Sequence, residues 1–201
     1  DRMYPQIKIN LEKLRHNTKT IVKMCHDNEI KHIFGVEKVA AGNLPAMEAV
    51  INSGITHIAD SRISNLRLVE AFPLPKVLVR IPMPSEAADT VKYSDISLNS
   101  EIHTIELLNK EAEKQNKIHG ILLMFDLGDL REGLWFKDDY IPAVEKILRL
   151  KNIKLAGIGT NLTCWGSIIP TYENLSLLTE IKEKIETKFN IPLEIISGGN
   201  S

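Results

Sequence analysis

The sequence predicts an α/β fold of parallel strands and helices, because short apolar segments alternate with amphipathic ones along its 201 residues. Several apolar segments, such as GILLMF at residues 120–125, are hydrophobic almost without interruption. That pattern is typical of parallel strands covered on both faces. No low-complexity segment or interdomain linker breaks the alternation, so we expect one domain over residues 1–201.

The elements follow from the spacing of apolar residues. A first helix is predicted after the N-cap candidate Asn10, with apolar residues at helical spacing: Leu11, Leu14, Ile21, Val22 and Cys25. The predicted strands cover residues 32–38, 56–60, 76–81, 95–98, 120–127, 153–160 and 193–197. The predicted helices between them cover residues 44–52, 63–71, 85–91, 100–115, 139–150 and 172–189.

Seven predicted strands follow the first helix, which leaves two architectures open. A doubly wound sheet could use seven strands in another order. A (β/α)8 barrel needs one more strand and helix, and typically about 250 residues. The chain stops immediately after the seventh strand, at IISGGNS, so we expect a fragment of a longer chain.

The composition is that of an ordinary soluble protein, with 43% hydrophobic and 25% charged residues. A formal net charge of -1 gives no field that would recruit nucleic acid or an anionic membrane. The apolar segments are too short to span a membrane, and the N-terminus lacks the apolar core of a signal peptide. The two cysteines, Cys25 and Cys164, lie far apart without metal spacing, so we expect a cytoplasmic protein.

Polar residues gather at the carboxyl ends of the predicted strands, where barrel enzymes build their sites. These ends carry Lys38, Asp60-Ser61-Arg62, Arg80, Asn99-Ser100, DLGDLR at 126–131, TNLTC at 160–164 and SGGNS at 197–201. The starts of the strands carry fewer candidate functional side chains, and this difference between the two ends predicts a site at the carboxyl ends. Arg80 and Asp60 lie at strand ends and could contribute to binding a substrate side chain, but either could equally belong to a structural ion pair.

Lys38 closes the first predicted strand. Alternation of side chains places it on the same side as Phe34 and Val36. If that side lines a barrel, the amine points along the barrel axis and can attack a carbonyl to form a Schiff base. A solvated lysine at a strand end is the competing interpretation, and spacing alone favours it.

The segment SGGNS at residues 197–201 follows the seventh predicted strand. Its two glycines and short polar side chains expose backbone N–H groups that suit an anion such as phosphate. Barrels often bind phosphate at the loops after their seventh and eighth strands. A Gly-Gly pair is also common in simple turns.

The segment DLGDLREGLW at residues 126–135 places Arg131 close beyond a buried strand. A planar guanidinium there could hold a phenolate, carboxylate or phosphate. The alternative is a surface ion pair among Asp129, Arg131 and Glu132, which would contribute little.

No metal site is predicted. Cys164 has no histidine in the adjacent sequence to act as its base, so a loop or buried cysteine is expected. The histidines are scattered without recurring ligand spacing: His16, His26, His32, His57, His103 and His119.

Taken together, the ordered motifs resemble one family. A lysine closing the first strand, DxGxxRxG after the fifth and GGNS after the seventh are similar to the alanine racemase-like barrels (fold type III) that bind pyridoxal 5'-phosphate (PLP). The segments GVEKV, ADSRISNL, VRIPM, DISLNS, GTNLTCWG and EIISGGNS resemble the ornithine racemase branch. This similarity covers nearly the whole chain in the expected order.

The resemblance implies a PLP-dependent amino-acid racemase, an isomerase of amino-acid metabolism, acting on ornithine or a similar basic amino acid. It implies that Lys38 forms the internal aldimine with PLP and is one of the two bases that remove and return the Cα proton. Arg131 matches the family arginine that lies beside cofactor and substrate.

The resemblance also implies a phosphate seat at the end of the chain. Asn200 and Ser201 match the segment whose backbone and serine hydroxyl hold the phosphate, with Ser197 and Gly198 supporting the turn.

Two positions depart from the family pattern. Alanine racemases have a histidine where this chain has Asn161, which argues against alanine as the substrate and makes Asn161 a candidate cofactor neighbour. Glu37 is an unusual acidic neighbour for the lysine, and the sequence offers no reason for it.

The family's last barrel strand, its second phosphate-binding segment and its C-terminal β domain have no counterpart in this sequence. That domain carries the opposing tyrosine base, supplied across a homodimer interface. We therefore expect the 201-residue chain to be the N-terminal PLP-binding barrel domain and not to racemise amino acids by itself.

Three other functions remain open from the sequence. A PLP carrier or homeostasis protein of the same fold would bind PLP with little catalysis. A Schiff-base aldolase barrel would use the lysine without PLP. A scaffold would use neither.

Overall fold

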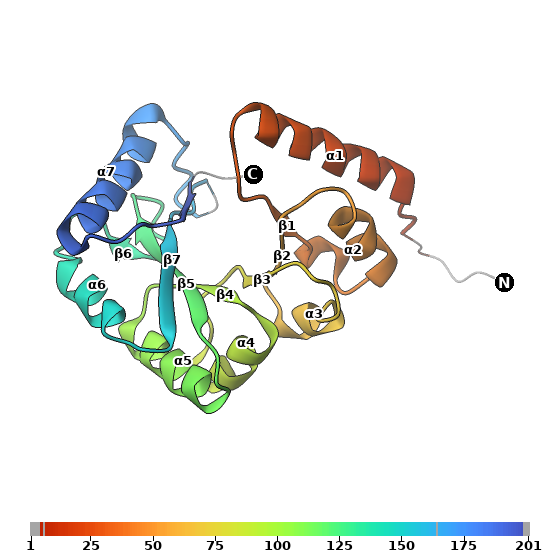
Figure 1. Cartoon of the computed structure of the whole chain (residues 1–201). Coiled ribbons are helices and arrows are strands. Elements are labelled where there is room, and N and C mark those ends of the chain that lie inside the picture. Colours follow the sequence, from red (N-terminus) through yellow and green to blue (C-terminus); the bar gives the residue numbers. More distant parts are fainter. Residues whose placement is uncertain (1–4, 6, 164, 199–201) are drawn as a thin grey trace. The chain divides into compact units, whose positions relative to one another are not determined.

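A computed structural model describes residues 5, 7–163 and 165–198. The chain forms two compact units, Asp1–Val77 and Leu78–Ser201. Each unit is built from parallel strands and helices that follow one another along the chain (Figure 1).

The first unit begins with helix α1 (Leu11–Asp27), whose N-terminus is capped by Asn10 through a hydrogen bond from the backbone N–H of Lys13. The other elements are β1 (Phe34–Val36), the 3-10 turn η1 (Lys38–Ala40), α2 (Leu44–Ile51), β2 (His57–Asp60), α3 (Ile63–Leu68) and β3 (Lys76–Leu78), which ends at the boundary. β1 pairs in parallel with β2, with Val36 opposite Ala59.

The core of the first unit lies where α1 and α2 meet β2. Met47 and Ile58 are fully buried there, and Val22 of α1 packs into the same cluster. A Cβ at Gly35 would lie 2.5 Å from the side chain of Ile55 and 3.2 Å from that of Val50, so these side chains would have to shift to admit it. Val50 of α2 and Ile55 of the following loop therefore pack closely on the backbone of β1, the strand that leads to Lys38.

The second unit contains the longest strands. Its elements are η2 (Pro84–Glu86), α4 (Ala87–Tyr93), β4 (Ile96–Asn99), α5 (Ile102–Lys114), β5 (His119–Asp126), β6 (Leu134–Trp135), α6 (Ile141–Leu148), β7 (Ile153–Gly159), α7 (Tyr172–Phe189) and β8 (Ile195–Ser197). The parallel order is β4-β5-β7-β8, with β6 paired to β5.

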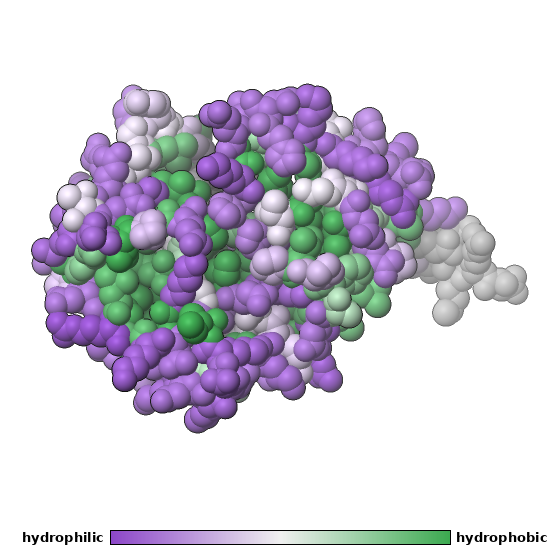
Figure 2. Space-filling model, in the orientation of Figure 1, coloured by the Kyte–Doolittle hydropathy of each residue, from purple (hydrophilic) through white to green (hydrophobic). Residues whose placement is uncertain are grey.

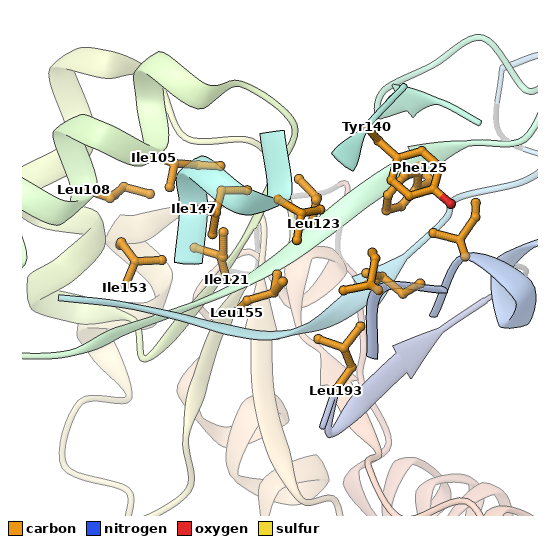
Figure 3. Packing of buried hydrophobic residues seen from close by; sticks show 14 of the residues in the cluster. Ile105, Leu108, Ile121, Leu123, Phe125, Tyr140, Ile147, Ile153, Leu155 and Leu193 are labelled. Atoms are coloured by element: carbon orange, nitrogen blue, oxygen red, sulfur yellow. The ribbon is translucent and has the colours of Figure 1, made fainter. Parts of the chain in front are cut away.

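The core of the second unit forms between β5 and β7 and the helices that cover them. Figure 3 shows Ile105 and Leu108 of α5 and Ile147 of α6 packed beside Ile121 and Leu123 of β5. Further along β5, the rings of Phe125 and Tyr140 meet edge to face with centroids 5.1 Å apart. These apolar side chains hold the carboxyl ends of the strands in place.

The predicted α/β fold of parallel strands is confirmed. Within each unit, every strand except β6 pairs with the next one along the chain. This is the strand order of a (β/α)8 barrel rather than of a doubly wound sheet. The third predicted strand, 76–81, is shorter than expected and ends at Leu78. The two-residue strand β6 was not predicted.

No helix in the described ranges is both long enough and apolar enough to cross a membrane. Large apolar side chains are nevertheless exposed at or near the carboxyl ends of strands, among them Val36, Val39, Leu130 and Ile196. Figure 2 shows apolar surface between hydrophilic side chains on the face drawn.

Candidate functional site

Lys38 lies on a tight turn rather than at the end of a strand, so the predicted strand over 32–38 is corrected. β1 ends at Val36, and the Glu37 N–H still donates to the Ala59 carbonyl at 2.7 Å. Lys38 then begins η1, which closes when the Ala40 N–H donates to the Glu37 carbonyl at 2.9 Å. The Lys38 side chain is exposed and makes no hydrogen bond or ion pair with any residue that the structure describes.

The turn after Lys38 depends on left-handed backbone at Ala41 and Gly42, with φ of 48° and 81°. Glycine at position 42 suits this conformation, and a Cβ there would also lie 3.1 Å from Leu68 of α3. The chain then enters α2 through the N-cap Asn43, whose side chain accepts from the Ala46 N–H at 3.1 Å. The segment VAAGN at residues 39–43 therefore fixes the backbone position of Lys38 from its C-terminal side.

Glu37, directly before the lysine, is buried with 3% of its surface exposed. Its Oε1 has no hydrogen-bond partner among the described residues. Burial, together with the negative charge of Asp60, raises the pKa of Glu37 to about 7. Near neutral pH this carboxyl therefore holds its proton for a substantial part of the time.

Asp60 and Arg80, the two strand-end residues without a predicted role, serve local structure. Asp60 is fully buried and accepts from the Arg62 N–H at 2.8 Å and from Asn65 Nδ2 at 3.1 Å. Arg80 makes a two-pronged ion pair with Glu86, each contact at 2.8 Å. That hydrogen bonding holds the pKa of Glu86 below its usual range.

The motif DxGxxRxG forms the loop after β5. Asp126 Oδ1 accepts from the N–H groups of Gly128 at 2.8 Å and Leu130 at 3.1 Å, which closes the loop. Gly133 has φ +128°, and a Cβ there would lie 2.4 Å from the backbone nitrogen of Asp126. The aspartate and glycine therefore shape the loop that carries Arg131.

Arg131 and Asn161, both predicted to bind the cofactor, are brought together by a third residue. The Nε of Arg131 lies 2.8 Å from Oε2 of Glu132, and the Asn161 amide Nδ2 donates to Oε1 of the same carboxylate. The alternative of a surface ion pair among Asp129, Arg131 and Glu132 holds only for the last two, since Arg131 pairs with Glu132 alone among the described residues.

Asp129 instead links the loop after β5 to the loop after β7. Its side chain accepts from the N–H groups of Trp165 at 2.9 Å and Ile168 at 3.1 Å, and only 1% of its surface is exposed. Burial acts to raise the pKa of Asp129, but these backbone donors, with those of Gly166 and Thr163, hold it below its usual value. This link fixes the loop that begins with Asn161.

Ser197 ends β8 and Gly198 follows it, beside the same loop. The N–H of Thr160 donates to the Ser197 carbonyl at 2.9 Å, so the ends of β7 and β8 are joined next to Asn161. A Cβ on Gly198 would lie 3.2 Å from Leu175 of α7. Asn200 and Ser201, the other predicted phosphate ligands, and Cys164 lie outside the described residues.

Buried polar atoms without a hydrogen-bond partner among the described residues gather at strand ends. Three of the four are Glu37 Oε1 after β1, Asn99 Oδ1 at the end of β4 and Thr160 Oγ1 after β7. Such atoms are rare and call for an explanation, which a bound ligand or water at these ends would supply. Within the described ranges no group of three or more His, Cys, Asp or Glu side chains could hold a metal ion.

Within the second unit, Arg131, Glu132 and Asn161 lie together beyond the carboxyl ends of β5 and β7, where barrel enzymes bind their ligands. The chain belongs to the family described as "Alanine racemase, N-terminal domain", which it matches over residues 9–201. This is the PLP-dependent family that the sequence resemblance names, and the resemblance is confirmed.

Two curated relatives align with almost the whole chain. The chain is 43% identical to "Ornithine racemase" of Acetoanaerobium sticklandii over 199 residues, covering 99% of this chain and 56% of the relative. It is 37% identical to "Lysine racemase" of Thermotoga maritima over 201 residues, covering 99% of this chain and 55% of the relative. The chain therefore spans about half the length of these relatives.

Solved structures agree on the fold. An alanine racemase from Streptomyces coelicolor A3(2) superposes with a TM-score of 0.80 at 17% identity, covering 96% of this chain and 53% of that one. A protein of unknown function from Bifidobacterium adolescentis superposes with a TM-score of 0.72 at 12% identity, covering 98% of this chain and 97% of that one.

Sequence reasoning missed one member of the site. Glu132 was considered only as part of a surface ion pair, whereas its carboxylate joins Arg131 to Asn161, 29 residues further along the chain. The available signal was its place directly after the arginine of the motif.

Proposed function

We propose that this chain is the PLP-binding barrel part of an amino-acid racemase that acts on ornithine or a similar basic amino acid. The observation that carries the proposal is the alignment of 99% of the chain with two racemases whose named substrates, ornithine and lysine, carry a side-chain amine. Asn161, in place of the histidine of alanine racemases, supports a substrate other than alanine.

The residues present suit PLP. The amine of Lys38, which has no partner among the described residues, would hold PLP through its aldehyde group. Arg131 has its Nη groups without partners among the described residues, which leaves them to bind an anionic oxygen. We assign the phosphate to the segment that Ser197 and Gly198 begin and that Asn200 and Ser201 continue.

PLP supplies an electron sink that makes the Cα proton of a bound amino acid removable. Lys38 Nζ then takes or returns this proton on one face of the substrate, and η1 sets the backbone position from which the side chain extends. A second base acts on the opposite face. We propose that it belongs to a tyrosine of a C-terminal domain in a cytoplasmic homodimer.

PLP attachment is tested by adding PLP to the protein, reducing with borohydride and mapping the modified peptide by mass spectrometry. We expect the label at Lys38 and an absorbance band of lysine-bound PLP. Lys38→Ala should lose both, whereas the exposed Lys31→Ala should keep both. Labelling of other lysines to the same extent in Lys38→Ala would contradict the assignment.

Substrate choice is tested with a protein that contains residues 1–201 together with the proposed C-terminal domain. This protein is loaded with PLP and incubated with a panel of amino acids, and the enantiomers are measured by chiral analysis. We expect ornithine or lysine to be racemised at least about tenfold faster than alanine. A protein that holds PLP at Lys38 but racemises no basic amino acid would instead be a PLP carrier.

A further inference from the structure

Glu132 lies between Arg131, which the proposed function assigns to PLP, and Asn161, the candidate cofactor neighbour of the sequence analysis. One carboxylate oxygen lies 2.8 Å from Arg131 Nε, and the other accepts from Asn161 Nδ2. The Glu132 side chain is mostly shielded, at 18% exposure, while that of Arg131 is 37% exposed. Both oxygens are already used, which suits holding other side chains better than moving a proton.

The carboxylate dictates the orientation of the Asn161 amide. A carboxylate can only accept hydrogen bonds, so the nitrogen of the amide must face it and the oxygen must face away. With Nδ2 held, Oδ1 of Asn161 is presented as an acceptor, and it has no partner among the described residues. Without Glu132 the amide could rotate and offer either atom.

The same carboxylate selects which edge of the Arg131 guanidinium is available. Its contact with Nε leaves Nη1 and Nη2 as a planar fork. Such a fork can donate two parallel hydrogen bonds to an anion. The pairing also places a negative charge against the arginine, which moderates the positive charge offered to a ligand.

We propose that Glu132 is a positioning residue that fixes Arg131 and Asn161 together in the orientation that binds PLP and its amino-acid substrate. This inference rests on the proposed function, and it gives a role to the acidic residue between Arg131 and Gly133.

The test compares Glu132→Ala and Glu132→Gln with Glu145→Ala, whose carboxylate pairs with Arg149 at 2.6 Å on an exposed face of α6. PLP affinity is measured by titrating the absorbance of lysine-bound PLP. We expect Glu132→Ala to weaken PLP binding by about tenfold or more, as for other hydrogen bonds to charged groups. Glu132→Gln keeps one acceptor, so about a threefold loss is expected, and Glu145→Ala should match the wild type.

A double-mutant cycle separates positioning from a merely structural role. If Glu132 acts through Asn161, the loss of PLP affinity caused by Asn161→Ala should largely disappear in the Glu132→Ala background. Thermal unfolding without PLP is recorded for every variant. Should Glu132→Ala fail to fold, the same cycle is run with Glu132→Gln.

The outcomes distinguish the two proposals. A wild-type protein that does not attach PLP overturns the proposed function. A wild-type protein that attaches PLP while Glu132→Ala and Glu132→Gln bind it like Glu145→Ala overturns the role of Glu132 alone. Additive losses in the cycle also overturn that role, because Glu132 would then not act through Asn161.

Discussion

At the scale of single residues, Glu37 makes the stability of the protein depend on pH around neutrality. Its folded pKa, raised to about 7 by burial and by Asp60, lies above the ordinary value of 4.5 expected in the unfolded chain. The neutral carboxyl therefore stabilises the fold fully below about pH 4.5, and this contribution is lost as the pH rises through 7. The loss is on the order of 3 kcal/mol of unfolding free energy.

Urea unfolding of the wild type and Glu37→Gln between pH 4.5 and 8 measures this contribution. The difference between the two is the quantity to follow, because His119 adds a slope of opposite sign. Burial lowers the pKa of His119 from its ordinary value of 6.5 to about 4. The neutral imidazole therefore stabilises the fold above pH 6.5, and this stabilisation is lost as the pH falls below 6.5. Exposed Glu48→Gln is the control. A difference that stays constant across the range would contradict the raised pKa.

At the scale of elements, β7 and β8 approach so closely that no side chain fits at one position. Gly157 pairs with Ile195, and a Cβ on Gly157 would lie 1.9 Å from the Ile195 carbonyl oxygen. Gly157→Ala must push β8 away from β7, and we expect a loss of about 2–3 kcal/mol in unfolding free energy. PLP affinity should fall as well, since β8 ends in Ser197.

Urea unfolding and PLP titration check this prediction side by side. Lys151→Ala, in an exposed turn before β7, provides the matched control. It should change neither the unfolding free energy nor the PLP affinity. A Gly157→Ala protein within about 0.5 kcal/mol of the wild type would mean that β8 can shift without loss.

Elements with strong sequence patterns were predicted closely. Helix α7 covers the predicted residues 172–189, and Thr171 caps it with a hydrogen bond from the Asn174 N–H at 3.2 Å. β6 was missed because two residues are too few to show a period. The third strand was predicted too long because the apolar run continues past Leu78, whereas the backbone leaves the sheet before Pro82 and Pro84, which lack an N–H.

The site was predictable to the extent that it follows strand ends. Lys38, Arg131 and Ser197 were selected because each lies at or beyond the carboxyl end of a parallel strand, and their roles in binding stay predictions. The role of Glu132 could not be found, since it depends on Asn161, which approaches only through the fold. The turn that carries Lys38 was missed because its left-handed residue Ala41 gives no sequence signal.

At the scale of the whole molecule, our proposal assigns Lys38 as the base for one face of the substrate. Residues 1–201 cover 56% of the ornithine racemase relative, and our proposal places the second base outside them. If this proposal holds, Lys38 removes a Cα proton and returns a solvent deuteron to the same face. Residues 1–201 loaded with PLP should therefore exchange the Cα proton of one ornithine enantiomer in D2O without inverting it.

Mass spectrometry after chiral separation follows exchange and inversion together. We expect inversion to be at least about 100-fold slower than exchange, the usual contribution of one general base. Lys38→Ala should abolish the exchange and Lys31→Ala should leave it unchanged, which assigns the proton transfer to one amine. Accumulation of the opposite enantiomer at the rate of exchange would show that residues 1–201 hold both bases, and the assignment of the second base would then be wrong.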